Sequence, residues 1–221
     1  TVEALVSRGH DLTILSRHSI VPSASQLGPN DYRSIAGDFR DSNVILSALK
    51  GIDCAIHLAW SGVPHKTITN PSFEFENNVI GSLPLIEACA KSQNVHLIFA
   101  SSGGTVYGSS ESLPICESHV TRPISAYGIS KVAVEHLVYM YHNSHDLKYT
   151  VLRISNAYGE RQVGTTGQGV IGTWLTRIKG GEAIQMVDDG SIVRDYIYVK
   201  DIAQAICLAA ESHDSNRTYN V

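Results

Sequence analysis

Short apolar runs alternate with stretches in which apolar residues recur every three or four positions. The first pattern is typical of buried strands and the second of amphipathic helices. The predicted strands span 11–15, 32–37, 53–59, 95–101 and 149–155, with shorter strands at 184–187, 193–198 and 218–221. The predicted helices span 1–9, 41–51, 71–92 (bent at Pro84), 126–145, 170–179 and 199–211.

Strands and helices in alternation predict an α/β fold, a doubly wound parallel sheet with helices on both faces. Ligands in such sheets bind beyond the carboxyl ends of the strands. The segments that follow Leu15, Gly37, Ala59, Ser101 and Ser155 are therefore the places to look for chemistry.

A catalytic pair is suggested by Tyr127 and Lys131, which lie four residues apart on the predicted helix 126–145. Residues at this spacing share one helix face, so both side chains can point into one site. A free tyrosine has a pKa near 10, and a nearby cation is expected to lower it toward the range of a useful base. Alone, the spacing favours a surface pair on the helix, since Tyr and Lys occur four apart by chance.

Two longer motifs change this interpretation. The strand that ends near Ala100 runs into Ser101-Ser-Gly-Gly-Thr-Val-Tyr-Gly108, and the tyrosine lies in Pro123-Ile-Ser-Ala-Tyr-Gly-Ile-Ser-Lys131. In this order and at this separation they resemble the extended short-chain dehydrogenases/reductases, the NAD-dependent epimerase/dehydratase family that modifies nucleotide sugars. The resemblance spans the whole chain and implies a Rossmann-like fold with Tyr127 and Lys131 as the catalytic pair.

Further segments match the family's cofactor site. Gly37-Asp38-Phe39 resembles the segment beside the adenine, Ile56-His-Leu-Ala59 the strand end along the pyrophosphate, and Asn77-Asn-Val-Ile-Gly81 a helix whose second asparagine braces the active site. The resemblance thus implies an NAD or NADP site, with the pyrophosphate carried at a helix N-terminus. The implied cofactor-binding residues are Ser16, Arg17, Asp38, Phe39, Leu58, Ala59, Trp60, Asn78, Ser101, Tyr127 and Lys131.

Two other segments resemble the family's substrate site. In Leu152-Arg-Ile-Ser-Asn-Ala-Tyr-Gly159 the asparagine, Asn156, is implied to contact the nucleotide sugar. In Arg194-Asp-Tyr-Ile-Tyr-Val-Lys-Asp201 the arginine is implied to bind the substrate diphosphate, which suits a permanently charged fork of donors; the alternative is a surface ion pair. The implied substrate-binding residues are Gly103, Tyr127, Asn156, Val170 and Arg194.

The catalytic serine or threonine of the family aligns with Gly103, which has no side chain. Ser102 and Thr105 are the neighbouring hydroxyls that could replace it. Thr105 is preferred, because alternate side chains of an extended segment share a face. Simple packing of Thr105 is the alternative.

Two other departures bear on the reaction and the cofactor. Family dehydratases and decarboxylases carry extra acids in this motif, whereas this chain has Gly103-Gly104-Thr105, which favours simple hydride chemistry. Family members that use NAD place an acidic residue after the strand that here ends at Leu15. This chain has Ser16-Arg17, and an arginine there can accommodate the 2′-phosphate of NADP. Alternatively, Arg17 covers the adenine without choosing between cofactors.

The resemblance implies an epimerase, in the first place one that acts at C4 of a UDP-linked sugar by transient hydride transfer to the bound cofactor. Tyr127 would exchange the proton of the 4-hydroxyl, and Lys131 would hold the nicotinamide ribose. An NADPH-dependent nucleotide-sugar reductase is the second hypothesis, supported by Ser16-Arg17. A non-catalytic dinucleotide or nucleotide-sugar sensor is the third, supported by the absence of a hydroxyl at Gly103.

Composition excludes other classes of function. The net charge of −4 argues against nucleic acid as a partner, and no apolar run has the length of a membrane span. The scattered cysteines and histidines do not form a metal-binding pattern, and free thiols favour the cytoplasm. The resemblance implies a homodimer with a four-helix contact through residues 71–92 and 126–145.

The sequence begins and ends at different places from the family pattern, which affects the expected domains. The family opens with a strand and a glycine-rich turn before the helix at which this sequence begins. We expect residues 1–159 to form the dinucleotide-binding domain without these elements, and residues 160–221 to form part of a substrate lobe with returning Rossmann elements. The 221-residue chain is then expected to bind NAD(P) weakly.

The assignment of Tyr127 gives a first test. Removal of the phenolic oxygen in Tyr127→Phe should abolish turnover in the intact protein, because the proton of the substrate hydroxyl then has no acceptor. Steady-state assays of the variant measure this. Retained activity would show that the assignment is wrong.

Overall fold

The computed structural model describes residues 1–17, 27–28, 30–62, 70–92, 94–110, 113–162, 169–184, 186 and 189–221. Its strands are β1 (Thr13–Ser16), β2 (Arg33–Ala36), β3 (Cys54–His57), β4 (His96–Ser102), β5 (Tyr149–Ile154), β6 (Asn156–Tyr158), β7 (Tyr196–Tyr198) and β8 (Arg217–Asn220). Four of them form the main sheet in the order β3-β4-β5-β8, and β1-β2 and β6-β7 are separate pairs. All these neighbours run parallel.

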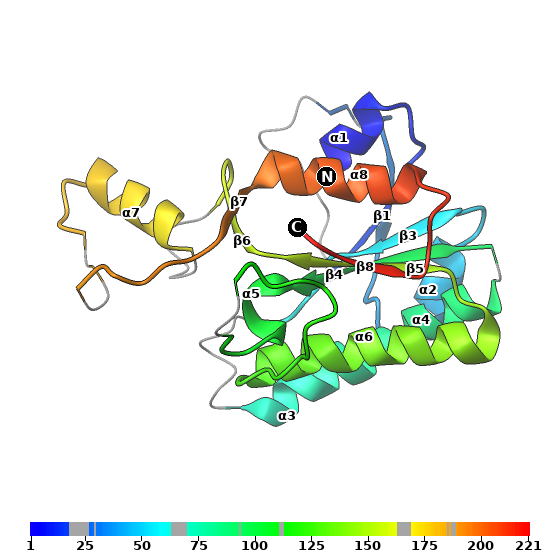
Figure 1. The fold of residues 1–221 in the computed structure, drawn as a ribbon. Coiled ribbons are helices and arrows are strands. Elements are labelled where there is room, and N and C mark those ends of the chain that lie inside the picture. The colour runs from blue at the N-terminus through cyan, green and yellow to red at the C-terminus, as the bar shows by residue number, and fades with distance from the viewer. Residues whose placement is uncertain are drawn as a thin grey trace.

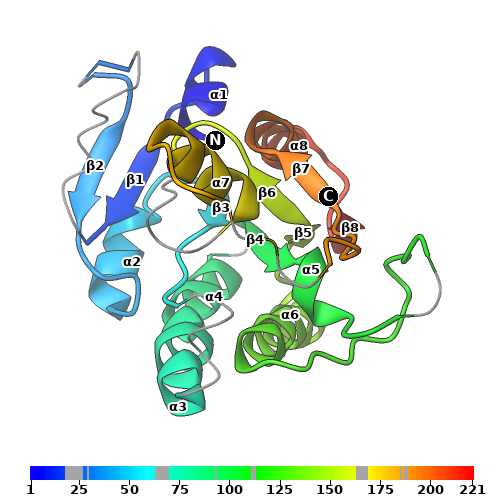
Figure 2. The same cartoon turned by 90° about the vertical axis from the view of Figure 1, so that its left-hand side faces the viewer.

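The helices alternate with the strands. They are α1 (Val2–Ser7), α2 (Ser42–Ala48), α3 (Pro71–Glu74), the π-helical η1 (Phe75–Ile80), α4 (Gly81–Lys91), α5 (Gly103–Val106), α6 (Ala126–His145), α7 (Val170–Lys179) and α8 (Val199–Glu211). Helices α3, α4 and α6 cover one face of the main sheet, and α1 and α8 cover the other (Figure 1). The same layers are visible from the end at which α5 and α7 lie (Figure 2). The expected doubly wound α/β fold is confirmed.

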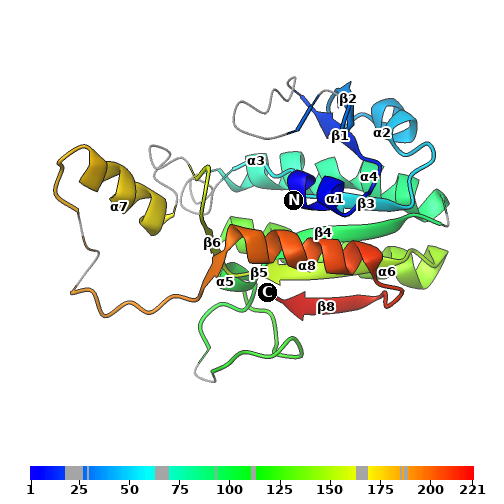
Figure 3. The ribbon, with the colours of Figure 1, turned by 90° about the horizontal axis from the view of Figure 1, so that it is seen from above.

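The segment with α7 stands apart from these layers. Viewed from above, α7 projects beyond one end of the sheet, whereas α8 and β8 return to it (Figure 3). Helix α7 lies within residues 160–221, for which a partial substrate lobe with returning Rossmann elements was expected. The boundary at residue 159 itself stays a prediction.

Capping side chains account for two well-predicted helices. The Asp41 carboxylate accepts from the N–H groups of Asn43 and Val44 at the start of α2. At the start of α6 the Ser125 hydroxyl accepts from the N–H of Gly128, and the helix ends at Asp146 in the left-handed conformation. Helix α6 begins and ends at the predicted residues because it has a cap at each end.

Two predictions of local structure need correction. The segment 71–92 is not one bent helix, because its irregularity is the π-helical turn η1, which ends at Ile80. Pro84 has no N–H to donate to the carbonyl of Ile80, so the regular hydrogen-bond ladder is interrupted there. The predicted strand 193–198 is limited to β7, Ile184 and Met186 lie outside any strand, and residues 185 and 187 lie outside the described residues.

Strand β4 organises the core because its side chains alternate between two buried faces. Leu97 and Phe99 pack toward α4 and α6, in a cluster with Val134 and Val138. Ile98 points the other way, into a cluster with Ile206 of α8. A parallel strand covered on both faces reads as one continuous apolar run, which is why the sequence predicted it well.

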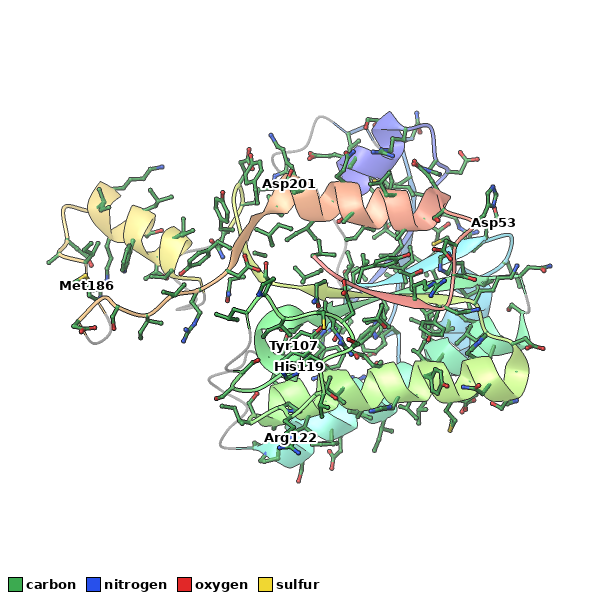
Figure 4. The ribbon with its side chains drawn as sticks, in the orientation of Figure 1. Asp53, Tyr107, His119, Arg122, Met186 and Asp201 are labelled. Carbon is green, nitrogen blue, oxygen red and sulfur yellow. The ribbon has the colours of Figure 1, made fainter. Side chains whose placement is uncertain are left out.

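A buried ion pair connects α6 to this sheet. Arg153 of β5 lies 2.7 Å from the carboxylate of Glu135 on α6, and both side chains are 9% exposed. Arg153 also donates to the Tyr107 hydroxyl at 2.8 Å, which in turn donates to Asn220 of β8 at 2.6 Å. Tyr107 lies beside His119 above α6, with their rings edge to face (Figure 4). The network joins α6, β5, β8 and the segment after β4.

Replacement of Arg153 tests how far the fold depends on this pair. Arg153→Met should lower the free energy of unfolding by about 3–5 kcal/mol, because it leaves the Glu135 carboxylate buried without its partner. Arg217→Met is the matched control, since Arg217 pairs with Asp214 on the surface and should cost no more than about 1 kcal/mol. Urea denaturation measures both losses, and equal losses would contradict the prediction.

Candidate active site

A cleft of about 800 Å³ opens at the carboxyl ends of β3, β4 and β5. Its walls come from the segments after these strands, the first turns of α6 and α7, and the chain before β7. Most of the predicted site residues line it: Leu58, Trp60, Ser101, Ser102, Thr105, Tyr127, Lys131, Asn156, Val170 and Arg194. The tertiary structure thus gathers residues that are more than 130 positions apart in the sequence into one site.

The other predicted residues lie outside this lining. Ala59 follows β3 and Gly103 opens α5, and neither is among the residues that line the cleft. Ser16 is the last residue of β1, and Arg17 follows it. Asp38 and Phe39 follow β2, so these four residues lie at the carboxyl ends of the paired strands β1 and β2.

A residue that the sequence analysis missed lies beside Asp38. Arg40 donates to both oxygens of the Asp38 carboxylate, with a shortest distance of 2.6 Å, and donates to Asn77 at 2.6 Å. Arg40, and more weakly Arg17, lower the pKa of Asp38. The Asp38 carboxylate is therefore held charged in a fixed orientation. The spacing of Asp38 and Arg40, two residues apart, is the sequence signal that could have predicted this pair.

Asn78 lies behind the cleft and contacts the segment after β3. Its side chain is fully buried in η1. The amide accepts from the N–H of Ser61 at 2.7 Å and donates to the carbonyl of Ser61 at 2.6 Å. This pair of bonds ties down the chain next to Trp60, which is a way for Asn78 to brace the site.

Tyr127 lies in the first turn of α6, where the Ser125 cap sets the start of the helix. The Ser102 side chain lies near enough to the phenol to lower its pKa. Burial, together with the Glu74 carboxylate, raises the pKa of Tyr127 to about 12, against the effect of Ser102. The sequence led us to expect a lowered pKa, but burial, the largest cause, shifts it upward, and Lys131 is not among the groups that shift it.

Lys131 is 4% exposed at the bottom of the cleft. Its Nζ donates to the carbonyl of Ala100 at 2.7 Å and lies 3.6 Å from the centre of the Trp60 ring. Burial lowers the pKa of Lys131 to about 7, although the carboxylates of Glu74 and Glu135 act in the opposite direction. The ammonium therefore exchanges its proton near neutral pH, while the Tyr127 phenol stays protonated.

The structure separates the two hydroxyls that could replace the missing one at Gly103. Residues 103–106 form the helical turn α5, so the argument for Thr105 from an extended segment was wrong. A side chain at Gly103 would place its Cβ 2.9 Å from the carbonyl oxygen of Arg153, too close for a serine in this backbone. Ser102 lowers the pKa of Tyr127, whereas Thr105 lines the cleft but its hydroxyl is buried without a hydrogen-bond partner among the described residues.

Polar groups for a substrate lie on the far side of the cleft. The Asn156 amide donates to the carbonyl of Asp195 at 2.8 Å, which joins β6 to the segment before β7. Arg194 is exposed and donates to the carbonyl of Val193. In the described part of the chain, Arg194 has no ion pair within 4.0 Å, so the alternative of a surface pair with Asp195 is not observed. Its guanidinium is available to an anion.

The sequence profile of the NAD dependent epimerase/dehydratase family matches residues 1–221. The chain belongs to this family. A UDP-glucose 4-epimerase of Mycolicibacterium smegmatis is 28% identical over 225 residues, which covers 100% of this chain and 72% of that protein. The likeness extends from the catalytic motifs to the whole length of the chain.

Solved structures of this family agree with the fold. The UDP-glucose 4-epimerase of Thermotoga maritima, solved with UDP-glucose, superposes with a TM-score of 0.89 at 29% identity, covering 100% of this chain and 71% of that one. The Thermus thermophilus enzyme in complex with NAD gives 0.86 at 32% identity and covers 100% and 72%.

Neither a metal site nor a membrane-spanning helix is found among the described residues. Within the described ranges, no three histidine, cysteine or acidic side chains come together as a metal site. None of the helices in the described part of the chain is long and apolar enough to cross a membrane.

The different positions of Ser102 and Thr105 predict different kinetic effects. Ser102→Ala should lower kcat about 100-fold, because Tyr127 loses the neighbouring group that lowers its pKa. Thr105→Val should mainly weaken ligand binding, by about tenfold or less, as expected for one lost hydrogen bond. Steady-state kinetics of both variants separate kcat from KM, and a larger loss of kcat in Thr105→Val would reverse the assignment.

Proposed function

We propose that this chain carries the active site of a nucleotide-sugar epimerase that acts at C4 of a UDP-linked sugar. The main support is the meeting of Tyr127, Ser102 and Lys131 in one cleft, which is also lined by Arg194, whose guanidinium has no ion pair among the described residues. Relatives named as UDP-glucose 4-epimerases, one of them solved with UDP-glucose, support the choice of substrate class.

The donors present in the cleft fit a nicotinamide dinucleotide. Lys131 reaches the cleft beside β4, and the buried Thr105 hydroxyl faces it without a partner. We propose that Lys131 holds the nicotinamide ribose, that Leu58, Ala59 and Trp60 line the pyrophosphate, and that Asp38 and Phe39 lie beside the adenine. When bound there, the cofactor would supply the hydride chemistry at the sugar carbon.

The protein's own part in this chemistry is proton handling. Tyr127 takes the proton of the 4-hydroxyl as the carbon is oxidised and returns it as the carbon is reduced. Because burial raises the pKa of Tyr127 to about 12, the phenolate needs stabilisation, which we assign to the Lys131 ammonium nearby and to the Ser102 side chain, which lowers this pKa. Because Gly103 has no hydroxyl, we propose that Ser102 takes the role of the catalytic serine or threonine of the family.

Substrate binding falls to the other wall of the cleft. The Arg194 guanidinium is suited to the diphosphate, since it can bind two oxygens at once. Asn156 and Val170 line the same wall and are proposed to contact the rest of the nucleotide sugar. Substrate held there would present its sugar to Tyr127.

The cofactor preference rests on the groups at the ends of β1 and β2. Arg17 is close enough to Asp38 to lower the pKa of that carboxyl. An arginine at this place supports NADP, whereas the NAD complex of the Thermus thermophilus relative supports NAD. We propose that the site accepts both cofactors.

Assembly and location complete the proposal. The helices α3, η1 and α6 expose apolar side chains, among them Phe73, Ile80, Tyr139 and Met140, each at least 46% exposed. They support a homodimer through a four-helix contact. All four cysteines are free, which supports a reducing, cytoplasmic location.

The intact protein, incubated with UDP-sugars and trace cofactor, should interconvert C4 epimers without a net change in nicotinamide absorbance. NMR of the sugar and absorbance follow the two signals together. Lys131→Met should abolish interconversion, while Lys91→Met, on the exposed surface of α4, should leave it unchanged.

Other outcomes would replace the proposal. Stoichiometric loss of NADPH on an added keto-sugar would identify a reductase. Binding of nucleotide sugar without either signal would identify a sensor.

A further inference from the structure

The Lys131 ammonium rests on an aromatic surface. The centre of the Trp60 ring is 3.6 Å from Nζ, and the rings of Phe99 and Tyr127 are 5.0 and 5.6 Å away. The indole is therefore the nearest ring, at a distance where the negative face of an aromatic ring attracts a cation.

The indole is itself held in place from below. Its Nε1 donates to the carboxylate of Glu74 at 2.8 Å, and Glu74 is fully buried in α3. The ring also contacts Phe99 of β4, with centres 5.8 Å apart. The second Glu74 oxygen has no hydrogen-bond partner among the described residues, so the indole is the main polar contact of this carboxyl group.

A buried ammonium needs substitutes for its lost water. One is the carbonyl of Ala100, which accepts a single hydrogen bond from Nζ. Two further groups that face Lys131 are a carboxylate that already has a partner and an imidazole that is uncharged. Glu135 is paired with Arg153, and burial lowers the pKa of His57 to about 3, which leaves it uncharged.

The remaining groups around Nζ act in different ways. Tyr127 is protonated at neutral pH and carries no charge. Glu74, whose pKa burial raises, favours the ammonium when ionised but opposes a Tyr127 phenolate. The indole favours the ammonium without that opposing charge, because an aromatic ring attracts a cation and bears no net charge.

We propose that Trp60, fixed by Glu74, is a positioning residue that keeps the Lys131 ammonium charged at the bottom of the cleft. The importance of that charge for turnover rests on the proposed function. The contact itself is a property of the chain and can be measured in the protein without substrate or cofactor.

Fluorinated tryptophans test the contact, because fluorine weakens the negative ring face while the size of the ring and the burial of Lys131 change little. The chain has two tryptophans, so Trp174→Phe leaves Trp60 as the only labelled position. NMR titration of ¹³Cε-labelled lysine follows the pKa of Lys131, whose signal is assigned by its loss in Lys131→Met. We expect the pKa to fall stepwise with each added fluorine, by about one unit over the series.

Two controls separate the indole from its surroundings. Glu74→Gln retains an oxygen for the indole N–H but removes the charge, and the fluorination series in this background should show the same slope. Leu58→Ala opens the same cleft without altering the ring, and it should leave the slope unchanged.

A pKa of Lys131 that does not respond to fluorination would overturn the inference. So would a rise of this pKa in Trp60→Leu, since it would mean that the indole only excludes water. In contrast, a normal fluorination series in a protein that fails to interconvert epimers would leave this inference standing and reject the proposed function.

Discussion

Burial of charge between α6 and the sheet is the constraint on which the rest of the structure depends. Lys131 and Glu135 lie one helical turn apart on the face of α6 that packs against β4 and β5, and both are at least nine-tenths buried. A buried charge is tolerated only with a partner. Glu135 contacts Arg153 of β5 and Ser101 of β4, and Lys131 contacts the carbonyl of Ala100. Together, these contacts fix the position of α6 along β4 and β5, and so its register against the sheet.

That register positions the reactive groups. Tyr127 precedes Lys131 by one turn, so fixing the lysine at Ala100 places the phenol beyond the end of β4, beside Ser102. The burial that makes the site precise also changes its acid–base chemistry. It raises the pKa of Tyr127 and lowers that of Lys131, so each group is held in its uncharged form more strongly than in water. The burial that fixes the geometry thus destabilises the charged forms of Tyr127 and Lys131. Neighbouring polar and aromatic groups partly offset this loss.

Sequence patterns predicted the secondary structure correctly where local preferences and tertiary packing favour the same backbone conformation. Helix α6 was predicted from 126 to 145 because caps and periodicity coincide there, and β4 because both of its faces are apolar. They failed where long-range contacts decide the backbone. The turn α5 was taken as extended, although a side chain at Gly103 would collide with the carbonyl of Arg153, fifty residues later in the chain. Arg40 was missed although its main partner, Asp38, is only two residues away, and only its second partner, Asn77, comes from a distant helix.

The sequence by itself determined the class of fold and the family, and it predicted the catalytic pair, since periodicity and motif spacing are local properties of a chain. Only the tertiary structure decided the environment of that pair. It placed Ser102 near enough to the Tyr127 phenol to lower its pKa, and it brought Trp60 and Glu74 beneath Lys131. Desolvation and contact distance depend on which segments pack together, and no spacing along the chain encodes them.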